Sequence, residues 1–399
     1  MRIFHPNVRS EYAQRGMEKA LAKGIVQQRD IDLVQEYVRE LKAQRHISDG
    51  RVFKIIYTLV QWRRFLTEPY STCSYNGILT AIEAMKSGKN VRGKAFKQNT
   101  QHDYIRILKP FLLWLIENGY NDLPEKKIRK IRSLPVDYAT TSPDELLTKD
   151  DVLALINACH TTRDKALIST LYESGCRIGE LGRLTWRNLV FDKYGIKMYI
   201  DDQKTKKVRF CRLTFSTIYL AAWKNEYPLK APDGDAPVFL TYQNKPLEYQ
   251  TVLAMLKRVA ERAAGAGWKA KKVHPHVFRK SRITDMIAEN YQESIIKEMM
   301  WGNPVTMMFK TYVKLSEQMI DNEMLDKAGI IKKEETVTNP LVTRVCGRCH
   351  KKNGPEARYC YHCGFELTEQ AVADMESFKE FVDGHLEEIY QLFSGFSQK

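Results

Sequence analysis

Apolar residues recur at intervals of three and four over residues 30–133, which is the period of an amphipathic helix. The pattern is clearest over residues 31–41, 52–60 and 104–115. We therefore expect four or five short helices in this part of the chain. The following stretch, residues 133–144, contains two prolines and has no periodicity, which indicates a linker.

The pattern changes after residue 147. Thr148, followed three residues later by Asp151, forms a capping box and predicts a helix over residues 149–173. Alternating and β-branched residues at 195–200 and 208–213 predict two strands joined by a hairpin. Helical periodicity returns from residue 248, with breaks at 265–272 and near Gly302. A helical framework with one small antiparallel sheet is an α+β fold, mainly helical.

The charge of the chain is strongly positive and unevenly distributed, which bears on its binding partner. The chain has 399 residues, enough for two or three domains, and a formal net charge of +15. Residues 51–133 hold 16 Lys and Arg against 6 Asp and Glu, whereas residues 364–399 hold 2 against 8. We expect the basic module to bind a polyanionic partner, and the alternative is that it is a solvated helical face. The acidic tail should face something else.

The sequence contains no run of eighteen apolar residues, and its first residues lack the apolar core of a signal peptide. We expect a cytoplasmic protein without a membrane partner.

Four of the eight cysteines lie in two CxxC pairs separated by ten residues: Cys346, Cys349, Cys360 and Cys363. Their thiolates can complete a tetrahedral Zn²⁺ site, which predicts a small zinc ribbon with a structural metal. A module of this size cannot bury a hydrophobic core. The metal would therefore supply most of its folding free energy. The other cysteines (Cys73, Cys159, Cys176 and Cys211) are expected to be core residues.

The task of this ribbon is left open by the sequence. Its arginines and lysines could touch DNA, or the ribbon could dock on a neighbouring protomer. The next segment, residues 367–393, has apolar residues at spacings of three and four with acidic residues on the other face. This amphipathic helix suits a partner helix or its own ribbon, and we favour packing on the same chain.

The candidate chemistry lies in four motifs. Cleavage of a phosphodiester needs a nucleophilic oxygen, cations at the non-bridging oxygens and a proton donor for the leaving oxygen. The chain offers such groups in the segments SGCRIGEL, QKTKK, HVFR and FKTYVK, whose key residues are Arg177, Lys204, His276 with Arg279, and Tyr312.

In these motifs the sequence resembles the tyrosine recombinases of the phage-integrase family, over about residues 30–325. The resemblance implies that Tyr312 attacks the scissile phosphorus and leaves a 3′-phosphotyrosine and a free 5′-hydroxyl. It also implies that Arg177 and Arg279 clamp the phosphate, that His276 is the general base, and that Lys204 protonates the leaving oxygen. The chemistry would need no metal, and four protomers would assemble on two DNA sites.

Three points stay open. Lys206 and Lys207 are close rivals of Lys204, and His274 is a rival of His276 without an arginine at the matching spacing. Nine residues before Tyr312 the chain has Asn303, where the family usually has His or Trp. This departure would cost about 1–3 kcal/mol of transition-state stabilisation, the scale of one hydrogen bond to a charged group.

We interpret the chain as a site-specific recombinase, the integrase of a mobile element. A catalytically impaired DNA-binding homologue and a type IB topoisomerase-like enzyme are the alternatives. The expected domains are an N-terminal extension (1–29), a helical DNA-binding domain (30–133), a linker (134–147), a catalytic domain (148–330), the zinc ribbon (340–366) and the C-terminal helix (367–399).

Overall fold

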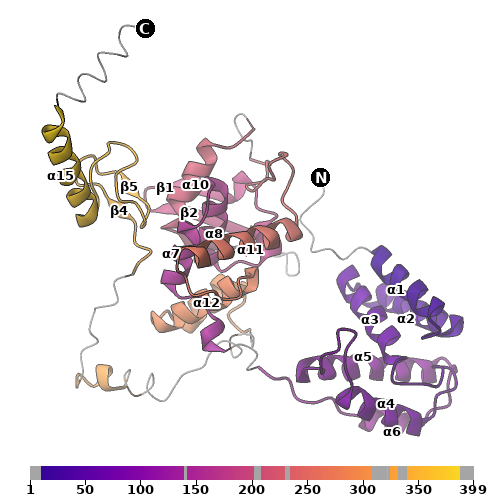
Figure 1. The fold of residues 1–399 in the computed structure, drawn as a ribbon. Coiled ribbons are helices and arrows are strands. Elements are labelled where there is room, and N and C mark those ends of the chain that lie inside the picture. The colour runs from indigo at the N-terminus through magenta and orange to yellow at the C-terminus, as the bar shows by residue number, and fades with distance from the viewer. Residues whose placement is uncertain are drawn as a thin grey trace. The chain divides into compact units, whose positions relative to one another are not determined.

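The computed structural model describes residues 10–138, 142–201, 208–229, 234–306, 309, 321, 324–330 and 339–386. The chain divides into two compact units, Pro6–Thr140 and the part from Thr141 onward (Figure 1). No helix among the described residues is long and apolar enough to cross a membrane.

The N-terminal unit is helical throughout its described part. Its helices are α1 (Ser10–Ala22), α2 (Gln28–Arg45), α3 (Asp49–Trp62), α4 (Tyr75–Ser87), α5 (Gln98–Glu117) and α6 (Glu125–Lys130). Leu59 and Trp62 of α3 pack with Phe111 and Leu112 of α5 in one buried core. The periodicity over residues 30–133 thus corresponds to five helices, of which α2 and α5 are long.

Helix α1 was not expected, because its residues were assigned to an N-terminal extension. Ala13, Met17 and Ala20 form an apolar stripe along α1 and are buried in the core of the same unit. α1 packs on α3. The extension is therefore part of the helical unit over its described residues.

The second unit is built around α8 (Thr162–Ser174). Among the residues that the structure describes, its other elements before the ribbon are α7 (Lys149–Asn157), α9 (Ile178–Leu181), β1 (Leu189–Asp192), β2 (Gly195–Asp201), β3 (Val208–Leu213), α10 (Ser216–Asn225), α11 (Tyr249–Gly265), α12 (Pro275–Ala288) and α13 (Glu293–Trp301), with short 3-10 turns at Pro143–Glu145 and Trp186–Asn188. Helices α7, α10 and α12 all pack on α8, which is buried along most of its length.

Two helices replace the single one expected over residues 149–173. The capping box of Thr148 and Asp151 begins α7 as predicted. The chain then leaves the helix at Ala158, and the hydroxyl of Thr161 accepts a hydrogen bond from the backbone N–H of Asp164 to begin α8. A second N-cap therefore divides the predicted helix.

The sheet is antiparallel with the order β1-β2-β3. Both predicted strands are present, with Ile196 opposite Leu213 and Met198 opposite Cys211 on the buried face. Strand β1 was missed by the sequence analysis. The hairpin between β2 and β3, which carries Lys204, lies outside the described residues.

The C-terminal ribbon has two short strands, β4 (Arg344–Val345) and β5 (Lys352–Asn353), followed by α15 (Glu369–Gly384). α15 is held to the ribbon at its first turns, where Ala371 is buried and Asp374 pairs with Arg358. Most of its remaining apolar face does not pack on the same chain among the described residues: Val372, Met375, Phe378 and Phe381 are exposed. Our preference for packing on the same chain is therefore wrong for this part of α15, because only its first turns reach the ribbon.

Candidate active site and metal centre

Arg177 stands at a turn between two helices. Gly175 ends α8 with φ of +56°, a left-handed conformation that suits glycine. Arg177 is then the N-cap residue of α9, and Glu180 accepts hydrogen bonds from the Arg177 backbone N–H (2.7 Å) and from its Nη1 (2.8 Å). The Arg177 side chain is 46% exposed. The turn therefore presents to solvent a guanidinium that Glu180 orients.

Arg279 lies under the same turn and is only 2% exposed. Its Nη1 donates to the carbonyl of Gly175 (2.7 Å) and its Nη2 to the carbonyl of Met300 (2.8 Å). The guanidinium also lies 5.0 Å from the centre of the Trp301 ring, and Trp301 is buried, as expected of a core residue. Arg279 thus ties the Arg177 turn to the end of α13.

His276 is in the first turn of α12, three residues before Arg279. Desolvation and the nearby charges of Lys280 and Arg279 lower the pKa of His276 to about 4, and Arg177 contributes in the same direction. The imidazole keeps contact with solvent, and the positive charges of Lys280, Arg279 and Arg177 lower its pKa in the same direction as desolvation does. At neutral pH the imidazole is therefore uncharged and can accept a proton.

Asn303 follows Gly302, the left-handed residue that ends α13. Its side chain is exposed, and its Oδ1 accepts a hydrogen bond from the Val305 backbone N–H at 2.9 Å. The amide NH₂ is the donor that this side chain could offer to a phosphate. Tyr312 and Lys204 lie outside the described residues.

Three segments therefore meet at the end of α8: the Arg177 turn, the start of α12 and the end of α13. Residues 145–319, which include all three, match the phage integrase family. This part of the chain is a domain of the phage integrase family.

The chain is similar to transposase A from transposon Tn554 of Staphylococcus aureus, with 29% identity over 189 residues. That alignment covers 44% of this chain and 50% of the transposase, so the chain matches about half of the length of that relative. The tyrosine recombinase XerC of Shewanella oneidensis is 22% identical over 67% of this chain and 83% of its own length.

Solved structures show that the fold is shared. Lambda integrase bound to DNA superposes with a TM-score of 0.53 at 14% identity, over 72% of this chain and 99% of that one. The Tn1549 transposon integrase in complex with a circular intermediate DNA gives a TM-score of 0.54 at 18% identity, over 73% and 98%.

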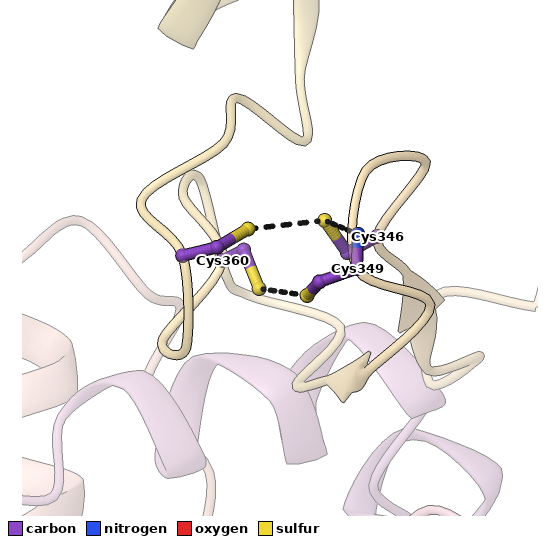
Figure 2. Close-up of side chains that lie close together, drawn as sticks. Cys346, Cys349 and Cys360 are labelled. Atoms are coloured by element: carbon purple, nitrogen blue, oxygen red, sulfur yellow. Dashed lines mark hydrogen bonds between the residues drawn. The ribbon is translucent and has the colours of Figure 1, made fainter.

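The paired cysteines lie beyond the residues that match the phage integrase family. Their four Sγ atoms lie within 4.8 Å of one another, and Figure 2 shows the sulfurs of Cys346, Cys349 and Cys360 turned toward a common centre. Cys346 is 3.6 Å from Cys363, and Cys349 is 3.5 Å from Cys360. Tetrahedral Zn²⁺ with Zn–S bonds of about 2.3 Å would place its sulfurs about 3.8 Å apart. The cluster therefore fits a zinc ion.

The two CxxC turns have the same backbone hydrogen bonds. The N–H of His350 donates to the carbonyl of Cys346, as that of Gly364 does to Cys360, both at 2.9 Å. His350 and Gly364 both have positive φ, 55° and 72°. The fold thus repeats one sulfur-presenting turn, and the His350 side chain stays outside the cluster.

The carboxylate of Glu356 joins the ribbon to the rest of the second unit, residues 142–330, which we call the catalytic unit. The sequence analysis did not single out this residue. Glu356 pairs with Lys165 of α8 at 3.0 Å and accepts a hydrogen bond from the hydroxyl of Tyr219 of α10. Burial and the Glu356 charge raise the pKa of Tyr219, so this hydroxyl remains a donor. Leu341, just before the ribbon, is buried in the core of the catalytic unit.

Proposed function

We propose that the protein is a site-specific DNA recombinase that cleaves and rejoins duplex DNA through a 3′-phosphotyrosyl intermediate. The observation that carries this proposal is the meeting of Arg177, His276 and Arg279 at the end of α8, with His276 uncharged at neutral pH. We infer further that it is the integrase of a mobile element, which the likeness to the Tn554 transposase and the Tn1549 integrase supports.

In the proposed reaction the Tyr312 hydroxyl attacks the scissile phosphorus while His276 takes its proton. The bond between phosphorus and the 5′-oxygen breaks, and Lys204 gives a proton to that oxygen. One phosphate ester replaces another, so the reverse reaction can rejoin a strand without an energy source.

The cations have separate tasks in this scheme. Arg177 is exposed and offers its guanidinium fork to the non-bridging oxygens. Arg279 adds positive charge from beneath the same turn and fixes the turn by its two carbonyl contacts. Asn303 would donate one hydrogen bond but bring no positive charge. We therefore expect a slower reaction than with the histidine usual in the family, but not the loss of the reaction.

Covalent capture tests this proposal. The purified protein is incubated with fragmented DNA and denatured, and the DNA that stays attached is recovered and sequenced. We expect attached DNA that ends at one recurring sequence. Tyr312→Phe should capture none while retaining DNA binding, whereas Tyr194→Phe, which alters an exposed turn tyrosine, should capture normally.

The outcomes separate the alternatives. Absence of any adduct with intact binding would identify a non-catalytic homologue. Adducts spread over unrelated sequences, together with relaxation of plasmids that lack the recurring site, would identify a topoisomerase-like enzyme.

We also propose that the four paired cysteines hold one structural Zn²⁺. The sulfur separations support this, and the metal would close the two turns into one folded module. Metal analysis of the purified protein should find one zinc per chain. Cys360→Ser should lose most of it and Cys73→Ala, a core cysteine of the other unit, should keep it.

For the whole chain we propose a helical DNA-binding domain over residues 30–133, into which the described part of residues 1–29 packs. It is followed by a linker over 134–147, the catalytic domain over 148–330, the ribbon over 340–366 and the acidic helix segment over 367–399. Double-stranded DNA would be the partner, with four protomers in the active complex. Sedimentation of the complex with DNA carrying the recurring site would give the number of protomers.

A further inference from the structure

Arg209 of β3 is a buried arginine outside the proposed catalytic set. It faces the interior with Cys211 and Leu213, the residues two and four positions later on the strand, and is only 3% exposed. Its Nη2 donates to Glu180 Oε2 at 2.6 Å, and its Nη1 donates to the carbonyl of Met299 at 2.5 Å. A buried guanidinium is costly to desolvate, so its contacts determine what it does.

The first contact leads to Arg177. Glu180 is 6% exposed and is shared by two arginines: Oε1 accepts from Arg177 and Oε2 from Arg209. One end of this carboxylate is therefore fixed by a buried cation, and the other end orients the exposed one. Oε2 also accepts from the Arg177 backbone N–H at 2.7 Å, so Arg209 is the second of two donors at this end. Without Arg209 the carboxylate keeps only the backbone donor at Oε2 and loses the buried cation, so the direction that it gives the Arg177 guanidinium is less firmly fixed.

The second contact leads to α13. Met299 lies in the last turn of α13, just before Gly302 and Asn303. A Cβ placed on Gly302 would lie 3.6 Å from Cδ of Arg209, so the turn that ends α13 packs on the arginine stem. In the sequence, Arg209 also follows the hairpin that carries Lys204 by only two residues. One side chain therefore joins β3, the Arg177 turn and the end of α13.

We propose that Arg209 is a positioning residue for strand cleavage, which acts on the phosphate through Glu180 and Arg177. This inference rests on the proposed function. Arg209 is buried and acts on Arg177 only through Glu180. Its loss should therefore lower the rate constant of cleavage, whereas the affinity of the protein for DNA should stay nearly unchanged. Misplacement of a positioned group by about 1 Å lowers rates on the order of a hundredfold, so we expect a loss of about tenfold to a hundredfold.

The test is single-turnover cleavage of a nicked DNA substrate that traps the adduct, measured for the full chain. The rate constant reports the positioning of groups in folded molecules, whereas the amplitude reports the fraction that is folded. Arg209→Lys keeps a cation beside Glu180 but cannot reach Glu180 and Met299 together, so its rate constant should fall at unchanged amplitude. The rate constant of Arg209→Met should fall further than that of Arg209→Lys.

Arg212→Met is the matched control on the same strand, because it removes an arginine whose partner is the surface residue Asp192. Its rate constant should equal that of the wild type. In a Glu180→Gln background, Arg209→Lys should cost less than in the wild type, because the two residues act in one chain of contacts.

The outcomes are distinct. A wild-type rate constant in Arg209→Lys, or a loss confined to the amplitude, overturns the positioning role. Additive losses in the Glu180→Gln background overturn the route through Glu180. If the wild-type protein forms no adduct at all, the proposed function fails instead.

Discussion

Glu180 and Arg279 show how single side chains organise this site. Each joins a turn to a segment distant in sequence, and each does so with charged hydrogen bonds in a buried place, where such bonds are strong and their loss costly. The exposed Arg177 owes its direction to these buried neighbours. Among the described residues, the groups around Arg177 are therefore already held in place by the fold.

His276 gives a direct test at this scale. Its pKa is about 4 in the folded protein, against an ordinary value of 6.5. In a nuclear magnetic resonance titration of the free protein, the signal absent from His276→Gln should titrate well below pH 6.5. Titration at 6.5 or above would contradict the cationic surroundings described here.

The same shift has a consequence for stability. Between pH 6.5 and 4 the unfolded chain binds a proton that the folded His276 does not, so stability falls as the pH drops through this window. His276→Gln should reduce this loss, as measured by urea unfolding at about pH 7 and about pH 4.5. An equal loss in both proteins would mean that other groups cause it.

Gly175 gives a second test at the residue scale. Its φ of +56° disfavours any residue with a Cβ, and the new atom would lie 2.7 Å from the Met300 side chain. Gly175→Ala should lower the free energy of unfolding by about 1–2 kcal/mol. Gly265→Ala at the end of α11, where a Cβ meets nothing within 4 Å, should be neutral or stabilising.

The sequence motifs named Arg177, His276 and Arg279 from local patterns, and the structure brings these residues close together at the end of α8. Their catalytic roles stay predictions. Arg209 and Glu356 were missed because their partners are 29 and 191 residues away. An arginine on the inward face of an alternating strand was the available signal for Arg209.

At the scale of elements, periodicity predicted most of the helices and the strands β2 and β3 correctly. The break between α7 and α8 contains no glycine or proline, so the expected helix ran through it. Strand β1 is only four residues long and gave no clear alternation. The exposed face of α15 could not be foreseen, because an amphipathic pattern does not say what covers it.

The contact of the ribbon with α8 and α10 leads to a prediction about zinc. Removal of the metal should unfold the ribbon and release Glu356 from Lys165 and Tyr219. A chelator should therefore lower the melting temperature of the catalytic unit. In Glu356→Ala the melting temperature should already be reduced, and chelation should lower it less. Equal shifts in both proteins would show that the contact does not couple them.

At the scale of the whole molecule, the charge is divided between a basic helical unit and an acidic C-terminal segment. Sequence alone predicted this division, since charge is additive along the chain. The distribution predicts where salt should act, because each phosphate contact that releases counterions steepens the dependence of binding on salt.

Lys94 and Lys97 are exposed in the basic unit and test this directly. Changing both to Gln should make the slope of log K against log salt shallower by about 0.9 for each lysine that neutralises a phosphate. Lys379→Gln in the acidic α15 should leave the slope unchanged. Equal slopes in the wild type and both variants would remove these lysines from the DNA interface.

The most direct measurement is the chemical identity of the protein–DNA linkage. The trapped adduct is digested with nuclease and protease and the peptides are analysed by mass spectrometry, while the released DNA strand is tested for end-labelling by polynucleotide kinase. We predict a nucleotide remnant on Tyr312 and a 5′-hydroxyl that accepts the label without prior phosphatase treatment. A remnant on another residue, or a released strand that already carries a 5′-phosphate, would contradict the account.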